Sequence, residues 1–242
     1  MKTEIGQCAY CLEAREVTRD HVVSNALFPD EYIRKNVIIA PSCKECNNGF
    51  SLDEEFFRNF VCGISAGVSP EAKTLFHSKI KRALTRKPKL AFQTFNAMQL
   101  VNLFSRKGKY LGIKTRWNIS EEDWRRYFRV LDKYIKGLIY HELGSPLPKG
   151  YLIKHFVVTE DNLPQFIEYS KFLGKWNRDN EDVFSYGYNF VPNTFNSVWM
   201  TVFYKNMYFP TMVMTQEQID LAAQEKKQEI DNKQFMQSDA LT

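Results

Sequence analysis

Four of the five cysteines form two close pairs, Cys8 with Cys11 and Cys43 with Cys46, and 31 residues separate the pairs. A two-residue gap lets both thiolates of a tight turn face one ion, so two such pairs supply the four sulfur ligands of a tetrahedral zinc ion. Disulfides are disfavoured in the reducing compartment that we expect for this chain. We therefore predict one structural Zn²⁺ on these four cysteines, and a buried thiol at Cys62 in the apolar segment "FRNFVCG".

Between the two cysteine pairs, the segment "TRDHVVSNALFP" places the carboxylate of Asp20 beside the imidazole of His21. A neutral imidazole, with an ordinary pKa of about 6.5, can take a proton from water near neutral pH, which makes His21 a candidate general base. The carboxylate of Asp20 and the amide oxygen of Asn47 are hard ligands, suited to Mg²⁺ or Mn²⁺. Without this chemistry, Asp20 and His21 are a surface pair, and Asn47 and Asn48 are residues of a helix end or turn.

The surrounding sequence predicts the elements that must position these side chains. Residues 16–23 and 36–42 have the branched, alternating pattern of short strands. A helix is expected from the second cysteine pair onward, interrupted at Gly49 and restarted by a capping-box pattern, Ser51 with Glu54. The restarted helix carries an aromatic face made of Phe56, Phe57 and Phe60.

In this order of strand, long loop, strand and helix, His21 ends the first strand and Asn47 begins the helix. Both side chains can then point into one cleft. Neighbours in an ideal strand point to opposite faces, so a shared site for Asp20 and His21 requires the strand to bend or end there.

These residues resemble the motif of the HNH endonuclease family. The matching segments are "RDHVV" for the first His, "KNVIIAPSC" for the central Asn, and "CKECNNGFS" for the last cysteine pair and the metal-binding helix. Many members carry a His directly after the second Cys or four residues further on, where this chain has Asn47 and Ser51. The variant is similar to an H-N-N type, as in some phage junction resolvases and the HNH domain of RNA-guided CRISPR effectors. The resemblance is limited to residues 1–65.

The resemblance implies a zinc-stabilised ββα-metal unit that hydrolyses phosphodiester bonds in DNA, most simply double-stranded DNA. His21 would be the general base, and Asp20 with Asn47 would hold Mg²⁺ or Mn²⁺ as the Lewis acid. Asn48 stays open as the ligand in place of Asn47. Asn36 would support the loop between the strands by hydrogen bonds from its amide to backbone groups. The alternatives are a zinc-stabilised nucleic-acid-binding module without catalysis, and an RNase.

The charge distribution favours a polyanionic partner. The net charge is only +5, but no Asp or Glu lies between Glu71 and Glu121, an interval with twelve Lys and Arg. Each cation that meets a phosphate releases condensed counterions, although such a block can also be a solvated face. The residues expected to bind nucleic acid are Lys79, Lys81, Arg82, Arg86, Lys87 and Lys89.

The rest of the chain predicts a second domain. The turn-rich segment "GISAGVSP" at residues 63–70 suggests a boundary, which divides the chain into residues 1–65 and 66–242. A basic helix is expected over residues 71–86, and the clearest helix opens at Ser120 and ends at Gly144. Residues 151–158, 182–191 and 197–214 predict strands of an antiparallel sheet, and residues 216–242 a polar helical tail. The expected fold class is therefore α+β in both domains.

Composition sets the remaining expectations. Hydrophobic residues make up 44% of the chain, and no apolar run is long enough to span a membrane. The first ten residues lack the apolar core of a secretory signal, so we expect a cytoplasmic protein. One ββα-metal unit cuts one strand, so a double-strand break requires a second copy. We expect any homodimer contact beyond Pro70. The sequence leaves open whether a partner protein directs the cut.

Overall fold

The N-terminal part of the chain is a small antiparallel sheet with helices packed against it. The computed structural model describes residues 4–159, 162–221 and 224. The sheet has the order β1-β2-β3, and β2 pairs with β3 through the register Val17 to Cys43 and His21 to Ile39. Its elements are β1 (Glu4–Gln7), β2 (Ala14–His21), β3 (Ile39–Cys43), α1 (Lys44–Gly49) and α2 (Ser51–Ser65).

The predicted order of strand, loop, strand and helix is confirmed, but the predicted capping box at the start of α2 is wrong. Phe50, between α1 and α2, keeps a near-helical backbone, and no side chain caps the helix there. The Ser51 hydroxyl donates to the carbonyl of Asn48 at 2.9 Å instead. The aromatic face of α2 is buried as expected, with Phe56, Phe57 and Phe60 in the core.

Three short helices and a helical turn follow α2. They are α3 (Pro70–Leu75), a π-helical turn (Phe76–Ile80), α4 (Lys81–Arg86) and α5 (Pro88–Asn96). Leu75, Ile80 and Leu84 are buried, so the predicted basic helix has the predicted apolar side. Ser69 caps α3 by accepting a hydrogen bond from the backbone N–H of Ala72, and Pro70 opens the helix where its missing N–H costs nothing.

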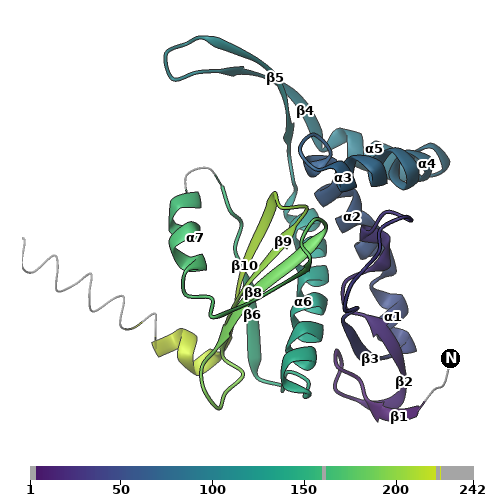
Figure 1. The fold of residues 1–242 in the computed structure, drawn as a ribbon, viewed down its shortest axis with the longest axis vertical. Coiled ribbons are helices and arrows are strands. Elements are labelled where there is room, and N and C mark those ends of the chain that lie inside the picture. The colour runs from purple at the N-terminus through teal and green to yellow at the C-terminus, as the bar shows by residue number, and fades with distance from the viewer. Residues whose placement is uncertain (1–3, 160–161, 222–223, 225–242) are drawn as a thin grey trace, which may run out of the picture.

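A two-stranded ribbon, β4 (Met98–Phe104) with β5 (Tyr110–Trp117), extends away from the rest of the molecule (Figure 1). No sequence pattern predicted this ribbon. It leads into α6 (Glu121–Leu143), the longest helix. The predicted ends of α6 are confirmed: Ser120 and Asp123 form a capping box, and Gly144, at φ 66°, closes the helix in the left-handed conformation.

The C-terminal half is a five-stranded antiparallel sheet with the order β6-β10-β9-β8-β7. Helix α7 (Leu163–Ser170) follows β6. The predicted strands in residues 151–158, 182–191 and 197–214 are confirmed, and the last interval contains the turn between β9 and β10. The strands are β6 (Tyr151–His155), β7 (Lys175–Asn180), β8 (Phe184–Phe190), β9 (Ser197–Phe203) and β10 (Met207–Thr215). The protein is therefore a mixed α+β fold with antiparallel sheets.

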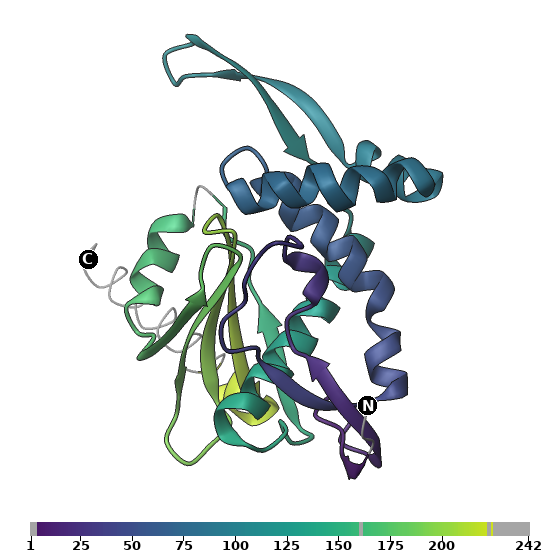
Figure 2. The same cartoon turned by 45° about the vertical axis from the view of Figure 1, so that its right-hand side comes forward.

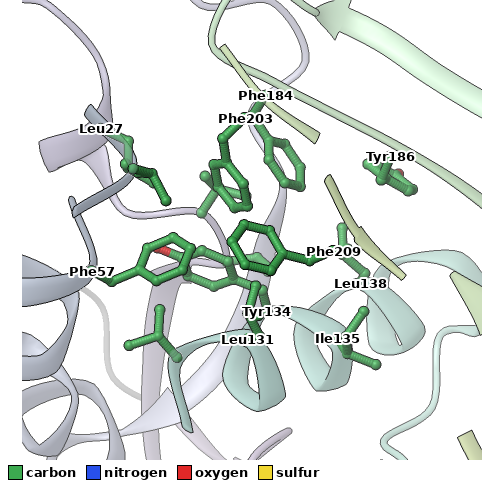
Figure 3. Packing of buried hydrophobic residues seen from close by; sticks show 14 of the residues in the cluster. Leu27, Phe57, Leu131, Tyr134, Ile135, Leu138, Phe184, Tyr186, Phe203 and Phe209 are labelled. Atoms are coloured by element: carbon green, nitrogen blue, oxygen red, sulfur yellow. The ribbon is translucent and has the colours of Figure 1, made fainter. Parts of the chain in front are cut away.

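One hydrophobic core runs through both halves of the chain. Phe57 of α2 packs edge-on against Tyr134 of α6 and Phe203 of β9, with ring centroids 6.0 and 5.1 Å away (Figure 3). The hydroxyl of the buried Tyr204 donates to the carbonyl of Leu27 at 2.7 Å. Figure 2 shows α6 between the N-terminal unit and the large sheet. Residues 63–65 of the predicted boundary segment belong to α2, and residues 66–69 connect it to α3. The division into residues 1–65 and 66–242 stays a prediction.

No helix in the described part of the chain combines the length and the apolar character that crossing a bilayer requires. The predicted polar tail lies mostly outside the described residues, because residues 222–223 and 225–242 are not described.

Candidate functional site

The four cysteines of the two pairs form one cluster. The sulfur atoms of Cys8, Cys11, Cys43 and Cys46 all lie within 4.8 Å of one another, and those of Cys11 and Cys43 are 3.9 Å apart. Tetrahedral Zn–S bonds of about 2.3 Å place neighbouring sulfurs about 3.8 Å apart. The cluster therefore has the size and donor set of a site for a structural metal such as zinc.

Local backbone geometry creates this cluster. The first pair lies in the turn from β1 to β2, where Leu12, at φ 68°, donates its N–H to the carbonyl of Cys8. Pairing of β2 with β3 brings the second pair alongside. The backbone N–H of Cys43 then donates to Sγ of Cys8 at 3.4 Å, and that of Cys46 to Sγ of Cys43 at 3.5 Å. Such bonds stabilise thiolates, the form in which cysteine binds metal.

The thiol of Cys8 has a lowered pKa. Burial opposes ionisation of Cys8, but hydrogen bonds from the backbone of Cys11, Cys43 and Tyr10 outweigh it and lower the pKa of this thiol to about 7. Cys62 lies outside the cluster, and burial raises the pKa of its thiol to about 12. It is the buried thiol that the sequence predicted.

His21 lies at the end of β2, half-buried, opposite Ile39. The side-chain nitrogen of Asn25 faces Nδ1 at 3.5 Å, and the oxygen of the same amide accepts a hydrogen bond from Arg34. Because the amide nitrogen is a donor, this orientation leaves the lone pair on Nδ1 and the hydrogen on Nε2. Burial first, and then the positive charge of Arg34, lower the pKa of His21. The imidazole is therefore neutral at neutral pH, as a general base must be.

Asp20, next to His21 in β2, belongs to a buried charge network. Its Oδ2 accepts a hydrogen bond from the hydroxyl of Tyr10 at 2.9 Å and lies 3.0 Å from Nζ of Lys133. Lys133, whose side chain is 1% exposed, also lies 2.7 Å from Oε1 of Glu54. Burial raises the pKa of Glu54, while Lys133 opposes that shift. Asp20 and His21 thus have different hydrogen-bond partners, although the charges of Asp20 and Lys133 act on His21.

Whether this network suits a divalent cation depends on its remaining donors and charge. Oδ2 of Asp20 is occupied, but no hydrogen bond within the described residues reaches Oδ1. A carboxylate that is held on one oxygen and open on the other resembles an oriented metal ligand. The charges of the network are nearly balanced, however, because Arg126 and Arg129 both bind Asp53 beside the triad of Asp20, Lys133 and Glu54. The catalytic divalent ion stays a prediction.

The three asparagines of the predicted site lie in different settings. Asn47 is half-buried in α1, and Asn48 is exposed beside it. Neither side-chain amide makes a hydrogen bond among the described residues, so the choice between the two as metal ligand stays open. Asn36 has φ 42° and donates its amide to Oδ2 of Asp179 at 2.9 Å. The sequence predicted that this amide would hydrogen-bond to backbone groups and support the loop between the strands. It binds β7 instead because the loop lies against that strand, where Lys35 and Asn180 also exchange two hydrogen bonds.

The predicted nucleic-acid-binding residues divide into two groups. Lys79 binds Asp30 at 2.7 Å, and Lys87 binds Glu55 at 2.7 Å, so both cations have internal partners. The guanidinium of Arg82 donates to the carbonyl of Ser78. The other three residues are exposed and form no ion pair within the described residues: Lys81, Arg86 and Lys89.

Sequence reasoning missed the residues that surround Asp20. Lys133, Tyr10 and Glu54 come from α6, the first cysteine turn and α2, so no local pattern joins them. One signal was present: Arg126, Arg129 and Lys133 recur at helical spacing on a helix that otherwise buries apolar residues.

Comparison of the chain with known protein families, with curated proteins and with solved structures finds no match.

Proposed function

We propose that this protein is a zinc-stabilised endonuclease that hydrolyses phosphodiester bonds in DNA, with His21 as the general base. The supporting observation is a half-buried imidazole with a lowered pKa at the end of β2. Asn25 orients the ring of His21. The part of the chain that contains His21 has the order strand, loop, strand and helix, and it carries the four clustered cysteines. This combination fits the HNH resemblance and gives the base a protonation state suited to its role.

The chain's own residues support each part of the reaction. Water replaces the 3.5 Å contact of Asn25 at Nδ1 of His21, and this nitrogen then takes a proton from the water as the water oxygen forms a bond to phosphorus. The P–O bond to the 3′ oxygen breaks, and this oxygen leaves with the bonding electron pair and is protonated by solvent. Arg34 supplies positive charge next to the phosphate. Its guanidinium donates to the amide oxygen of Asn25, which contacts His21, and lies 5.0 Å from the ring centroid of Phe28.

Asp20, through Oδ1, and Asn47 would hold a divalent ion, which when bound would stabilise negative charge on the phosphate and the leaving oxygen. The second candidate function is a zinc-stabilised nucleic-acid-binding module without catalysis. One observation favours it: Asp20 already has an internal cation, because Lys133 lies 3.0 Å from its carboxylate.

The test is cleavage of supercoiled plasmid and of structured RNA by the purified protein with Mg²⁺, Mn²⁺ or EDTA. His21→Asn removes the base but preserves polarity and approximate size. We expect it to retain zinc, thermal stability and DNA affinity while cleavage falls by about 10²- to 10⁴-fold. His77→Asn, at an exposed histidine of the π-helical turn, is the matched control and should cleave like the wild type.

Equal cleavage by folded His21→Asn and wild type would reject the proposed role of His21. Binding of DNA without cleavage under any metal condition would select the non-catalytic module, and cleavage of RNA alone would select the RNase.

A further inference from the structure

The ribbon of β4 and β5, residues 98–117, is an isolated antiparallel pair. It extends from the helices of the molecule in both views (Figures 1 and 2). Its strands are paired from Met98 with Trp117 to Phe104 with Tyr110, and the register shifts once near the tip. Leu100 and Ile113, on one face, are 75% and 62% exposed, and no described side chain of either strand is buried. A ribbon without a core on either face needs a partner to bury such residues.

The ribbon is anchored at its base to the zinc-stabilised unit. Trp117, the last residue of β5, packs edge-on against Phe60 of α2 at 5.9 Å. A Cβ at Gly63 would come within 3.0 Å of the same indole, so this glycine permits close approach of the ribbon to α2. The backbone N–H of Asn118 donates to the carbonyl of Ala97 at 2.7 Å and closes the base. The base of the ribbon thus packs against α2.

The charge of the ribbon has one sign. It lies inside the interval between Glu71 and Glu121, which contains no acid. Arg106, Lys107 and Lys109 are exposed at the tip, and none of them has an ion pair among the described residues. These cations differ from Lys79 and Lys87, whose charges are satisfied within the molecule.

A second copy of the chain is a poorer occupant than a polyanion. Two ribbons packed together would bring Arg106, Lys107 and Lys109 of each copy close to like charges, with no acid in residues 72–120 to pair with them. Phosphates neutralise these cations and release counterions. The apolar residues are compatible with DNA, because Leu100 and Ile113 can contact sugars and thymine methyl groups. The major groove of duplex DNA is also wide enough for a two-stranded ribbon.

We propose that the ribbon is a DNA-binding arm, which holds duplex DNA through phosphate contacts of Arg106, Lys107 and Lys109 while the zinc-stabilised unit acts nearby. The choice of duplex DNA as the partner rests on the proposed function, but binding of DNA by the ribbon does not depend on cleavage.

The experiment measures binding of a short DNA duplex to the full-length protein by fluorescence anisotropy over a range of salt concentrations. The test variant is the triple change Arg106→Gln, Lys107→Gln and Lys109→Gln at the solvated tip. The control removes three exposed charges outside the interval, Lys149→Gln, Lys171→Gln and Lys175→Gln. We expect the tip variant to bind at least tenfold more weakly and its log–log salt slope to fall by about 3, since each phosphate contact contributes about 0.9. The control should lose far less.

A second variant, Leu100→Ser with Ile113→Ser, tests the alternative occupant. If light scattering shows a wild-type dimer that this variant converts to a monomer, and the tip variant binds DNA like the wild type, the ribbon is a dimer contact and the proposal is wrong. A tip variant with unchanged affinity and salt slope overturns it equally. If the tip variant binds DNA more weakly but the wild type does not cleave plasmid, the proposed nuclease activity is rejected and the DNA-binding arm is supported. If the wild type cleaves plasmid but the tip variant binds DNA as the wild type does, the DNA-binding arm is rejected and the nuclease activity is supported.

Discussion

The ammonium of Lys133 lies 3.0 Å from the carboxylate of Asp20, and only 1% of the lysine side chain is exposed. This contact joins α6, in the second half of the chain, to the strand that carries the candidate base. The same ammonium lies 2.7 Å from Glu54, so one buried cation serves two carboxylates from different elements. Removing one partner of such a network leaves a buried charge unpaired, and that cost exceeds the value of the contact itself.

We therefore expect Lys133→Met to lower the free energy of unfolding by about 3–5 kcal/mol, measured by urea denaturation. Lys136→Met, on the same helix at a lysine without an ion pair among the described residues, controls for the substitution and should cost under about 1 kcal/mol. Adding Glu54→Gln to Lys133→Met should restore part of the loss, because it removes one of the two uncompensated carboxylates. Equal stabilities for Lys133→Met and Lys136→Met would contradict the buried network.

The pH dependence of stability tests Glu54. Its pKa is raised above the ordinary 4.5, chiefly by burial. The folded state therefore holds this proton to higher pH than the unfolded state, so the contribution of Glu54 is fully present below pH 4.5 and is lost as pH rises through the folded pKa. We expect the unfolding free energy of the wild type, relative to Glu54→Gln, to decrease with rising pH by at most about 1.4 kcal/mol per unit. Glu31→Gln, at an exposed position, controls for the change in net charge. A difference that grows with pH would contradict the raised pKa.

Metal removal tests the cysteine cluster. Cys43→Ser should lose bound zinc and unfold the N-terminal sheet, because the binding energy of a structural metal is folding energy. Cys62→Ser is the matched control: its sulfur donates to the carbonyl of Ala72 at 3.0 Å and lies outside the cluster. Elemental analysis should find one zinc per chain in the wild type and in Cys62→Ser. Full zinc content in Cys43→Ser would remove this cysteine from the site.

The elements that the sequence predicted are those whose signals are local. The ends of α6 depend on Ser120, Asp123 and Gly144, which lie within or next to the helix, and the cysteine spacing carries its own geometry. The ribbon was missed because both of its faces are exposed, so its apolar and polar residues do not alternate between core and solvent as in a half-buried strand. The capping box at Ser51 failed because Phe50 keeps a near-helical backbone between α1 and α2.

The candidate site was predictable only in part, for a related reason. The position of His21 at the end of β2 follows from the strand pattern. Its Asn25 and Arg34 partners follow from the course of an irregular loop, and the pairing of Asp20 with Lys133 depends on the docking of a helix 113 residues away. No sequence period specifies contacts of that range, so the partner of Asp20 required the structure.

The docking of α6 is itself testable at Gly137. A Cβ at this position would lie 2.6 Å from Cγ1 and 2.7 Å from Cγ2 of Val22, which is fully buried and follows His21. Alanine normally stabilises a helix relative to glycine by about 1 kcal/mol, but a contact this short forces α6 away from the segment that follows β2. We expect Gly137→Ala to lower the free energy of unfolding by about 1–3 kcal/mol net. Gly67→Ala is the control and should lower it far less, because its Cβ would meet no atom within 4 Å. Val22→Ala should rescue Gly137→Ala, with a favourable coupling of about 0.5–3 kcal/mol in a double-mutant cycle of urea denaturation. Additive effects would mean that α6 does not approach the strand of His21 at this residue.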